Sequence, residues 1–145
     1  MPLSIEDMML LKQADESYKK GNHAEALQYI DKYCVEFMRT FDAATPYEVM
    51  TAIAGIARQY QSIGEWEFAA LKFADVCAYA HKNEPGTTET AGDFYNLSNM
   101  LYNIKDYPNA LTALERSIDH LKKAGVWEAY ETTYVKLHNE LKKKL

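Results

Sequence analysis

Three segments of this chain share a short pattern, and their spacing constrains the fold more than any other feature. Each segment has a turn, then an aromatic residue or His, and three residues later an alanine. The alanines are Ala26, Ala69 and Ala110, which are separated by 43 and 41 residues. A recurrence at this period indicates a repeated supersecondary unit that stacks on its neighbours. The chain is therefore expected to be a short array of repeats.

Between these turns the apolar residues recur with helical spacing. Ile53, Ile56, Ala57 and Tyr60 follow one another along one face of a helix. No segment rich in Val, Ile and Thr alternates in the way that is typical of a strand. The sequence therefore predicts an all-α chain of seven helices, at about residues 4–20, 23–40, 46–63, 66–82, 88–104, 107–123 and 126–144.

Several helix starts carry recognisable capping signals. Ser4 with Asp7 resembles a capping box, and Thr45 with Glu48 forms a second one with Pro46 at the first helical position. These signals support the predicted boundaries and divide the first six helices into pairs.

The last predicted helix differs from the others because it is polar except for a narrow apolar stripe, formed by Trp127, Tyr130, Tyr134, Leu137 and Leu141. A stack of repeats leaves an apolar face open at its end, and one amphipathic helix can close it. We therefore expect a single domain over residues 1–145, with repeats at about 4–40, 46–82 and 88–123 and a capping helix at about 126–144.

The three units resemble the tetratricopeptide (TPR) repeat, whose signature is W-x2-L-G-x2-Y followed by A-x3-F. The best match is the second unit, which reads Ile53-x2-Ile56-Ala57-x2-Tyr60 and then Ala69-x3-Phe73. The third reads Phe94-x2-Leu97-Ser98-x2-Leu101 and then Ala110-x3-Leu114, and the first is weaker. The period exceeds the usual 34 residues by seven to nine. In this the chain is similar to the longer variants found in kinesin light chains, LGN-type adaptors and bacterial Rap regulators.

The resemblance implies a right-handed superhelix of three TPR-like helix pairs, whose first helices line a concave groove that binds a peptide or a partner helix. The positions that would face the groove are Lys12, Asp15, Tyr18, Lys19, Thr51, Gly55, Arg58, Gln61, Ser62, Tyr95, Asn96, Asn99, Tyr102 and Asn103. Asn96 and Asn99 are the most suggestive, because an amide side chain can both donate to and accept from the backbone of an extended ligand.

Composition excludes several classes of protein. The formal net charge of -5 argues against nucleic-acid binding, which needs a basic face. No apolar run approaches the ~18 residues of a membrane span. Two cysteines make no disulfide framework, which is typical of a reducing compartment. We therefore expect a cytoplasmic protein that neither binds nucleic acid nor inserts into a membrane.

The chain lacks the motifs of the common enzymes. The four histidines are at least 18 residues apart, show no metal-binding spacing, and are interpreted as surface or turn residues: His23, His81, His120 and His138. Cys34 and Cys77 are interpreted as small buried apolar residues. The six glycines are scattered, so no phosphate-binding loop is predicted. We expect a protein without catalytic activity, cofactor or metal.

Three functions are consistent with these observations. The favoured hypothesis is a protein-interaction module, adaptor or scaffold with a protein or peptide ligand in the groove. A chaperone of the type III secretion kind is an alternative, since such chaperones also have about three units on an acidic chain. A self-assembling scaffold subunit is another, because residues 8–11 place four large apolar side chains near the start of the first helix. Homo-oligomers through the first or last helix therefore remain open.

Overall fold

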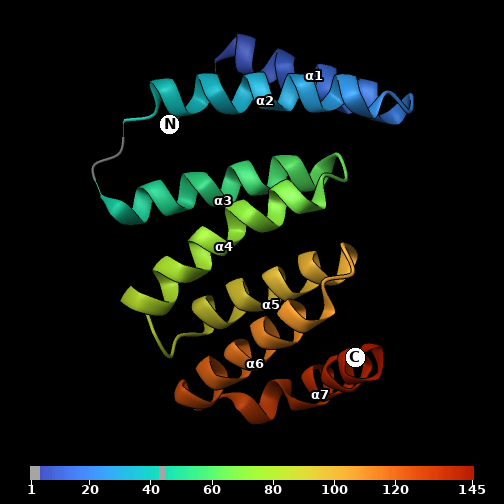
Figure 1. Cartoon of the computed structure of the whole chain (residues 1–145). Coiled ribbons are helices and arrows are strands. Elements are labelled where there is room, and N and C mark those ends of the chain that lie inside the picture. The colour runs from blue at the N-terminus through green and yellow to red at the C-terminus, as the bar shows by residue number, and fades with distance from the viewer. Residues whose placement is uncertain (1–3, 43–44) are drawn as a thin grey trace. The chain divides into compact units, whose positions relative to one another are not determined.

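The computed structural model describes residues 4–42 and 45–145, so residues 1–3 and 43–44 of the predicted domain lie outside the described part. The described residues form seven helices and no strand (Figure 1). The prediction of an all-α chain is confirmed, and every helix boundary lies within one residue of its predicted place. The helices are α1 (Ile5–Lys19), α2 (His23–Thr40), α3 (Pro46–Ser62), α4 (Trp66–Asn83), α5 (Thr88–Asn103), α6 (Tyr107–Lys123) and α7 (Trp127–Lys144).

The predicted capping signals act as expected at the helix starts. The Ser4 hydroxyl accepts a hydrogen bond from the backbone N–H of Asp7 at 3.0 Å. The Thr45 hydroxyl accepts from the N–H of Glu48 at 3.2 Å and donates to the Glu48 carboxylate at 3.1 Å. These bonds satisfy N–H groups that have no partner within the helix.

The three turns that join the paired helices have one geometry. Gly21, Gly64 and Lys105 adopt positive φ angles of 83°, 74° and 63°. In each turn the next N–H bonds back to a carbonyl five residues earlier, at 2.8, 2.9 and 2.9 Å. This is the Schellman arrangement, which ends a helix with a residue in the left-handed region. The repeat in the sequence therefore corresponds to a turn that recurs with the same backbone conformation and the same hydrogen bond.

The chain divides into two compact units, Met1–Ala69 and Ala70–Leu145, which are described separately. In the first unit α1 and α2 form an antiparallel pair joined by the turn at Gly21 (Figure 1). The hydroxyl of Tyr60 on α3 donates to the Asp31 carboxylate on α2 at 2.8 Å. The buried residues of the first unit include Ala14, Ala26, Ile30, Tyr33, Ile56, Ala57 and Tyr60.

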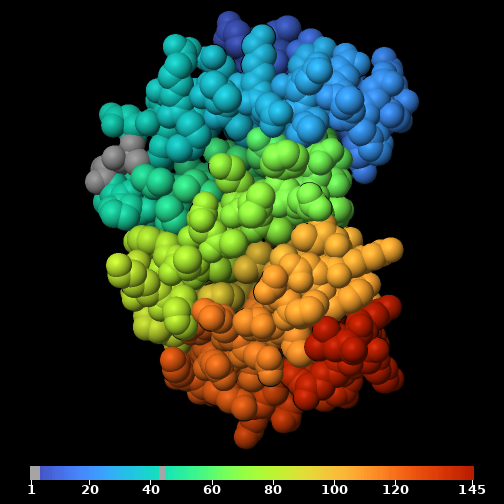
Figure 2. Space-filling model, in the orientation of Figure 1, coloured from blue at the N-terminus to red at the C-terminus, as the bar shows by residue number. Residues whose placement is uncertain are grey.

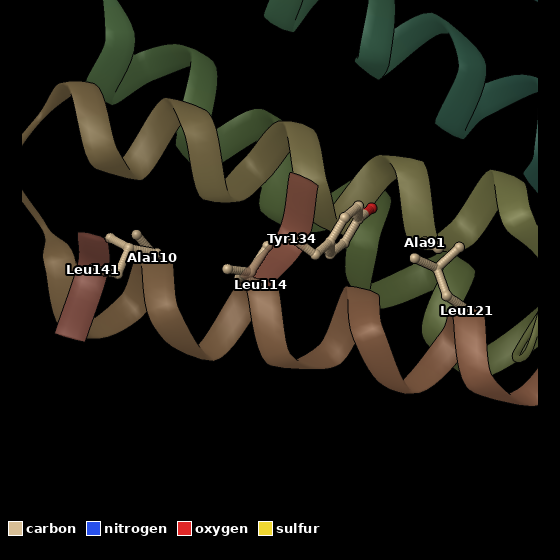
Figure 3. Packing of buried hydrophobic residues seen from close by; sticks show 6 residues of the cluster. All are labelled: Ala91, Ala110, Leu114, Leu121, Tyr134 and Leu141. Atoms are coloured by element: carbon tan, nitrogen blue, oxygen red, sulfur yellow. The ribbon is translucent and has the colours of Figure 1, made fainter. Parts of the chain in front are cut away.

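In the second unit α5 and α6 form the antiparallel pair, and α7 packs on α6. The space-filling view shows the red atoms of α7 directly against the orange atoms of α6 (Figure 2). Figure 3 shows the core that α5, α6 and α7 share. Leu114 and Tyr134 lie near its middle, with Ala110 and Leu141 at one end and Ala91 and Leu121 at the other. The full cluster is Ala91, Ala110, Leu114, Leu121, Tyr134 and Leu141. The predicted stripe on the last helix thus supplies two buried residues to this core.

One buried serine connects α5, α6 and α7 of this unit. The Ser117 hydroxyl on α6 donates to the carbonyl of Ala91 on α5 at 2.6 Å. Its oxygen lies 2.9 Å from the hydroxyl of Tyr134 on α7, which therefore acts as the donor in that bond. The core is thus fixed by directional bonds as well as by apolar contacts.

Candidate partner-binding surfaces

The predicted groove residues of α1 are partly engaged within the first unit. Lys12 is exposed, and Asp15 is exposed but forms an ion pair with Lys19 at 2.8 Å. Tyr18 is half-buried, and its ring lies 4.8 Å from that of His23. A Cβ placed on Gly64 would lie 3.3 Å from the Tyr18 hydroxyl. Tyr18 therefore contacts the turn after α3, which leaves only part of its ring for a ligand.

The predicted residues of α3 are nearer to solvent. Arg58 is exposed and Gln61 is half-buried. The backbone carbonyl of Gln61 accepts from the N–H of Gly64 at 3.0 Å, so this residue also belongs to the helix end. The long side chains of both residues can reach a ligand that lies along α3.

The predicted residues of α5 form a mixed polar and aromatic surface in the second unit. Asn96 is exposed and Asn99 is half-buried. Tyr95 and Tyr102 are half-buried and pack against the core cluster. The Tyr95 ring lies 4.9 Å from that of Tyr134 on α7. Asn99 follows Tyr95 by four residues and precedes Tyr102 by three, so helical spacing puts its amide on the same face of α5 as both rings.

Contacts with α6 and α7 fix the orientation of both tyrosines. The Tyr102 ring lies 5.4 Å from that of Tyr107 on α6, in an edge-to-face arrangement with 68° between the planes. Tyr95 is held by Tyr134, a residue that is only 5% exposed. Such rings lose little conformational entropy on binding, because their rotamers are already restricted.

A groove between α2 and α3 was not predicted as a site, although two of its lining residues, Thr51 and Gly55, were expected to face the ligand. A row of aromatic rings lines its α2 side, formed by Tyr33, Phe37 and Phe41. Successive ring centroids in this row are 5.8 and 5.3 Å apart. The α3 side includes Gln59, Ile56 and the exposed Tyr47. In the sequence, the regular spacing of four residues between Tyr33, Phe37 and Phe41 indicates that these rings share one face of the helix.

A second hollow lies between α1 and α2, and Phe37 lines both hollows. Met9, Leu10 and Gln13 of α1 face Lys32 and Glu36 of α2 there. The first turns of α1 also leave three large apolar side chains open to solvent, with exposures of 69% at Ile5, 49% at Met8 and 57% at Met9. Exposed apolar residues that lie together are typical of contact surfaces.

The interpretation of the histidines is wrong for His120. His120 is 1% exposed, and its Nε2 lies 3.1 Å from Nδ1 of His81. Burial, followed by the neighbouring His81 and Lys123, lowers the pKa of His120. The two histidines are 39 residues apart in the sequence, so no local motif indicated the pair. They meet because stacked repeats bring positions about one repeat apart into contact.

The remaining chemical expectations concern metals, thiols and membranes. Within the part of the chain that the structure describes, no three His, Cys, Asp or Glu side chains gather in a way that could hold a metal ion. Cys34 and Cys77 are both buried, as predicted. Among the helices of residues 4–42 and 45–145, none combines the length and the apolar character needed to cross a lipid bilayer.

Comparison with known proteins defines the class of fold. No protein-family model matches the chain, and no curated protein matches it. Solved structures do match it over nearly its whole length, and they are TPR-like repeat proteins. The chain therefore has the TPR-like helical-repeat fold that the sequence predicted.

Two of these structures come from a putative kinesin light chain of Podosopora anserina with nearly identical TPR-like repeats. One of them, a form with a single substitution, is 15% identical, with a TM-score of 0.55, and the match covers 97% of this chain and 74% of that one. The other is 16% identical, with a TM-score of 0.54 and coverages of 96% and 74%. The likeness is to the repeat fold.

Proposed function

We propose that this chain is a protein-interaction module without catalytic activity, which binds a peptide or a partner helix on the first helices of its repeats. The observation that carries the proposal is the surface of α5. There, Asn96 and Asn99 stand beside Tyr95 and Tyr102, whose rings are held by residues of α6 and α7. Amides beside ordered aromatic rings combine hydrogen bonding with apolar contact area, as protein interfaces do.

The expected ligand follows from the chemistry of this surface. Each asparagine offers both a donor and an acceptor, so each can pair with a peptide group whatever the ligand sequence. The two tyrosines supply flat apolar contacts beside them. We therefore propose an extended segment or an exposed helix of another protein as the ligand, in the reducing cytoplasm that suits two buried thiols.

Affinity capture from native cell extract, with identification of the retained proteins, tests the proposal. The double variant Asn96→Ala/Asn99→Ala should lose specific partners that the natural chain retains. A matched control is Asn22→Ala/Asn139→Ala, which removes two exposed asparagines outside α5. Circular dichroism should confirm that both variants keep the helical fold. If the α5 variant retains the same partners as the control, the assignment to α5 must be abandoned.

A self-assembling subunit is the second candidate, and it is supported by the exposed Ile5, Met8 and Met9 on α1. Burial of three such side chains would favour association by several kcal/mol before entropic costs, at roughly 1.5–3 kcal/mol each. Sedimentation over a wide concentration range tests this candidate. Met8→Glu/Met9→Glu should then reduce the mass to that of a monomer, whereas Leu71→Glu, at another exposed apolar position, should not. A natural chain that is monomeric at every concentration would remove this candidate.

A further inference from the structure

His81 and His120 are the centre of a hydrogen-bonded chain in the second unit. Nδ1 of His81 on α4 lies 3.1 Å from Nε2 of His120 on α6. The other ring nitrogen of His120, Nδ1, accepts a bond from the backbone N–H of Gly86 at 2.9 Å. Phe94 of α5 stacks on the His120 ring, with 5.5 Å between centroids. One buried imidazole thus joins α4, the α4–α5 connector, α5 and α6.

The direction of these bonds fixes where the protons are. A backbone N–H can only donate, so Nδ1 of His120 carries no proton when it accepts from Gly86. The neutral His120 ring then carries its proton on Nε2 and donates it to Nδ1 of His81. His81 in turn carries its proton on Nε2, so this arrangement requires two neutral rings. A metal ion binds an imidazole nitrogen through its lone pair, so Nε2 of His120 cannot be a metal ligand while it carries this proton.

Any added proton must break one of these bonds. A proton on Nδ1 of His120 removes the acceptor of the Gly86 N–H. A proton on Nδ1 of His81 sets two N–H groups against each other, and leaves the buried Nε2–H of His120 without an acceptor. A buried donor without a partner is unfavourable, so the intact arrangement excludes the proton.

Most of the charged and titratable groups around His120 oppose a positive charge on its ring. On its own helix, Lys123 and Arg116 oppose a positive charge on the ring, whereas Asp119 favours it. From α4 the titratable neighbour is His81, which also opposes the charge. From α5 the ring meets the uncharged Phe94, and from the connector it meets the N–H of Gly86.

The connector is closely packed where this bond holds it. Gly86 has a φ of +73°, and a Cβ placed on it would lie 3.0 Å from the Cβ of Lys123 on α6. Next to it, Thr87 caps α5 by accepting from the N–H of Thr90 at 3.1 Å. Release of Gly86 would therefore loosen the start of α5 as well as the connector.

We propose that the His81–His120 pair is a pH-sensitive latch, in which two neutral rings hold the α4–α5 connector on α6 and proton uptake below about pH 6 releases it. A proton on either ring breaks a bond of this arrangement, and burial, the largest cause, lowers the pKa of His120. The latch needs no ligand, so it stands apart from the proposed function.

The folded state binds fewer protons here than the open state, so acid favours opening. If the open state binds one proton with the ordinary histidine pKa of about 6.5, the ratio of open to closed molecules rises about 30-fold from pH 8 to pH 5. The hydrogen-exchange protection factor of the Gly86 amide is the inverse of this ratio, and it already corrects for the intrinsic effect of pH on exchange. We expect it to fall by about that factor, relative to the amide of Gly125, another turn glycine, which bonds to a backbone carbonyl.

Nitrogen-15 chemical shifts of the histidine rings provide the second readout. At pH 7.5 the proton of His120 should be found on Nε2, with Nδ1 unprotonated. A proton on Nδ1 of His120, or a Gly86 protection factor that is constant from pH 8 to pH 5, would overturn the proposal.

Two variants separate the latch from general acid instability. His81→Gln keeps an oxygen acceptor for His120 but cannot titrate, so the loss of Gly86 protection should move to lower pH. His138→Gln removes a histidine on α7, whose Nε2 lies 3.6 Å from Glu115, and should leave the profile unchanged. If His81→Gln shows the same profile as the natural chain, the effect belongs to other groups and the latch is wrong.

Discussion

The hydroxyl of Tyr60 lies 2.8 Å from a carboxylate oxygen of Asp31, which links α3 to α2. Tyr60 is 7% exposed, and burial together with this bond raises the pKa of its hydroxyl well above the usual range. The hydroxyl therefore stays protonated at neutral pH and acts as the donor in this bond. The bond fixes the position of α3 against the first helix pair.

Removal of this hydroxyl should destabilise the first unit. Tyr60→Phe keeps the ring and its stacking on Phe68 but deletes the donor, and we expect the free energy of unfolding to fall by about 1–2 kcal/mol. Urea unfolding followed by circular dichroism measures the change. Tyr29→Phe is the matched control, because Tyr29 donates to the exposed Glu25 on the same helix, and a loss below about 0.5 kcal/mol is expected there. Equal losses in the two variants would contradict this role for Tyr60.

The serine that joins α5, α6 and α7 should be among the most sensitive polar positions. Ser117→Ala leaves the buried Tyr134 hydroxyl without its acceptor and removes the side-chain donor to the Ala91 carbonyl. We expect unfolding to become easier by about 1–3 kcal/mol. In a double-mutant cycle with Tyr134→Phe, the combined loss should be smaller than the sum by about 1 kcal/mol. Strict additivity of the two losses would show that the bond between the hydroxyls contributes nothing.

The fold could be predicted from the sequence because its main signals are local. The capping box at Thr45 and the turn glycines at 21 and 64 act over a few residues, and each has the same effect in the structure as in the sequence pattern. The repeat period added the one long-range fact that was needed, since stacking follows from repetition.

The environment of individual side chains was harder to predict, because it depends on how helices cross. His120 was interpreted as a surface residue, yet packing with α4 and α5 buries it. Tyr95 was expected to face a ligand, and a contact with Tyr134 on α7 also occupies its ring. The sequence gives the face of a residue on its helix, but it does not give the helix that lies opposite. The binding role of Tyr95, Asn96 and Asn99 stays a prediction.

The turn at Lys105 offers a stabilising substitution. Lys105 occupies the left-handed region at a φ of 63°, where the equivalent positions of the other repeats have glycine. A side chain in this region is strained, so Lys105→Gly should raise the free energy of unfolding by about 0.5–1 kcal/mol. The reverse test is Gly21→Ala, where an added Cβ meets no atom within 4 Å and only backbone strain acts. That variant should lose about 1 kcal/mol, and a gain in stability would refute the argument.

The thiol of Cys77 should report the opening of the chain around it. Cys77 is 1% exposed, and burial, assisted by Asp93, raises the pKa of its thiol well above the usual range. Only the thiolate reacts with iodoacetamide, so alkylation at pH 8 requires a molecule that has opened around this residue. In the Cys34→Ala background, we expect the alkylation rate to be slow in buffer and to rise with urea in parallel with the unfolded fraction. A rate in buffer equal to that of the urea-unfolded chain would mean that Cys77 is accessible in the folded protein, which would contradict its buried position.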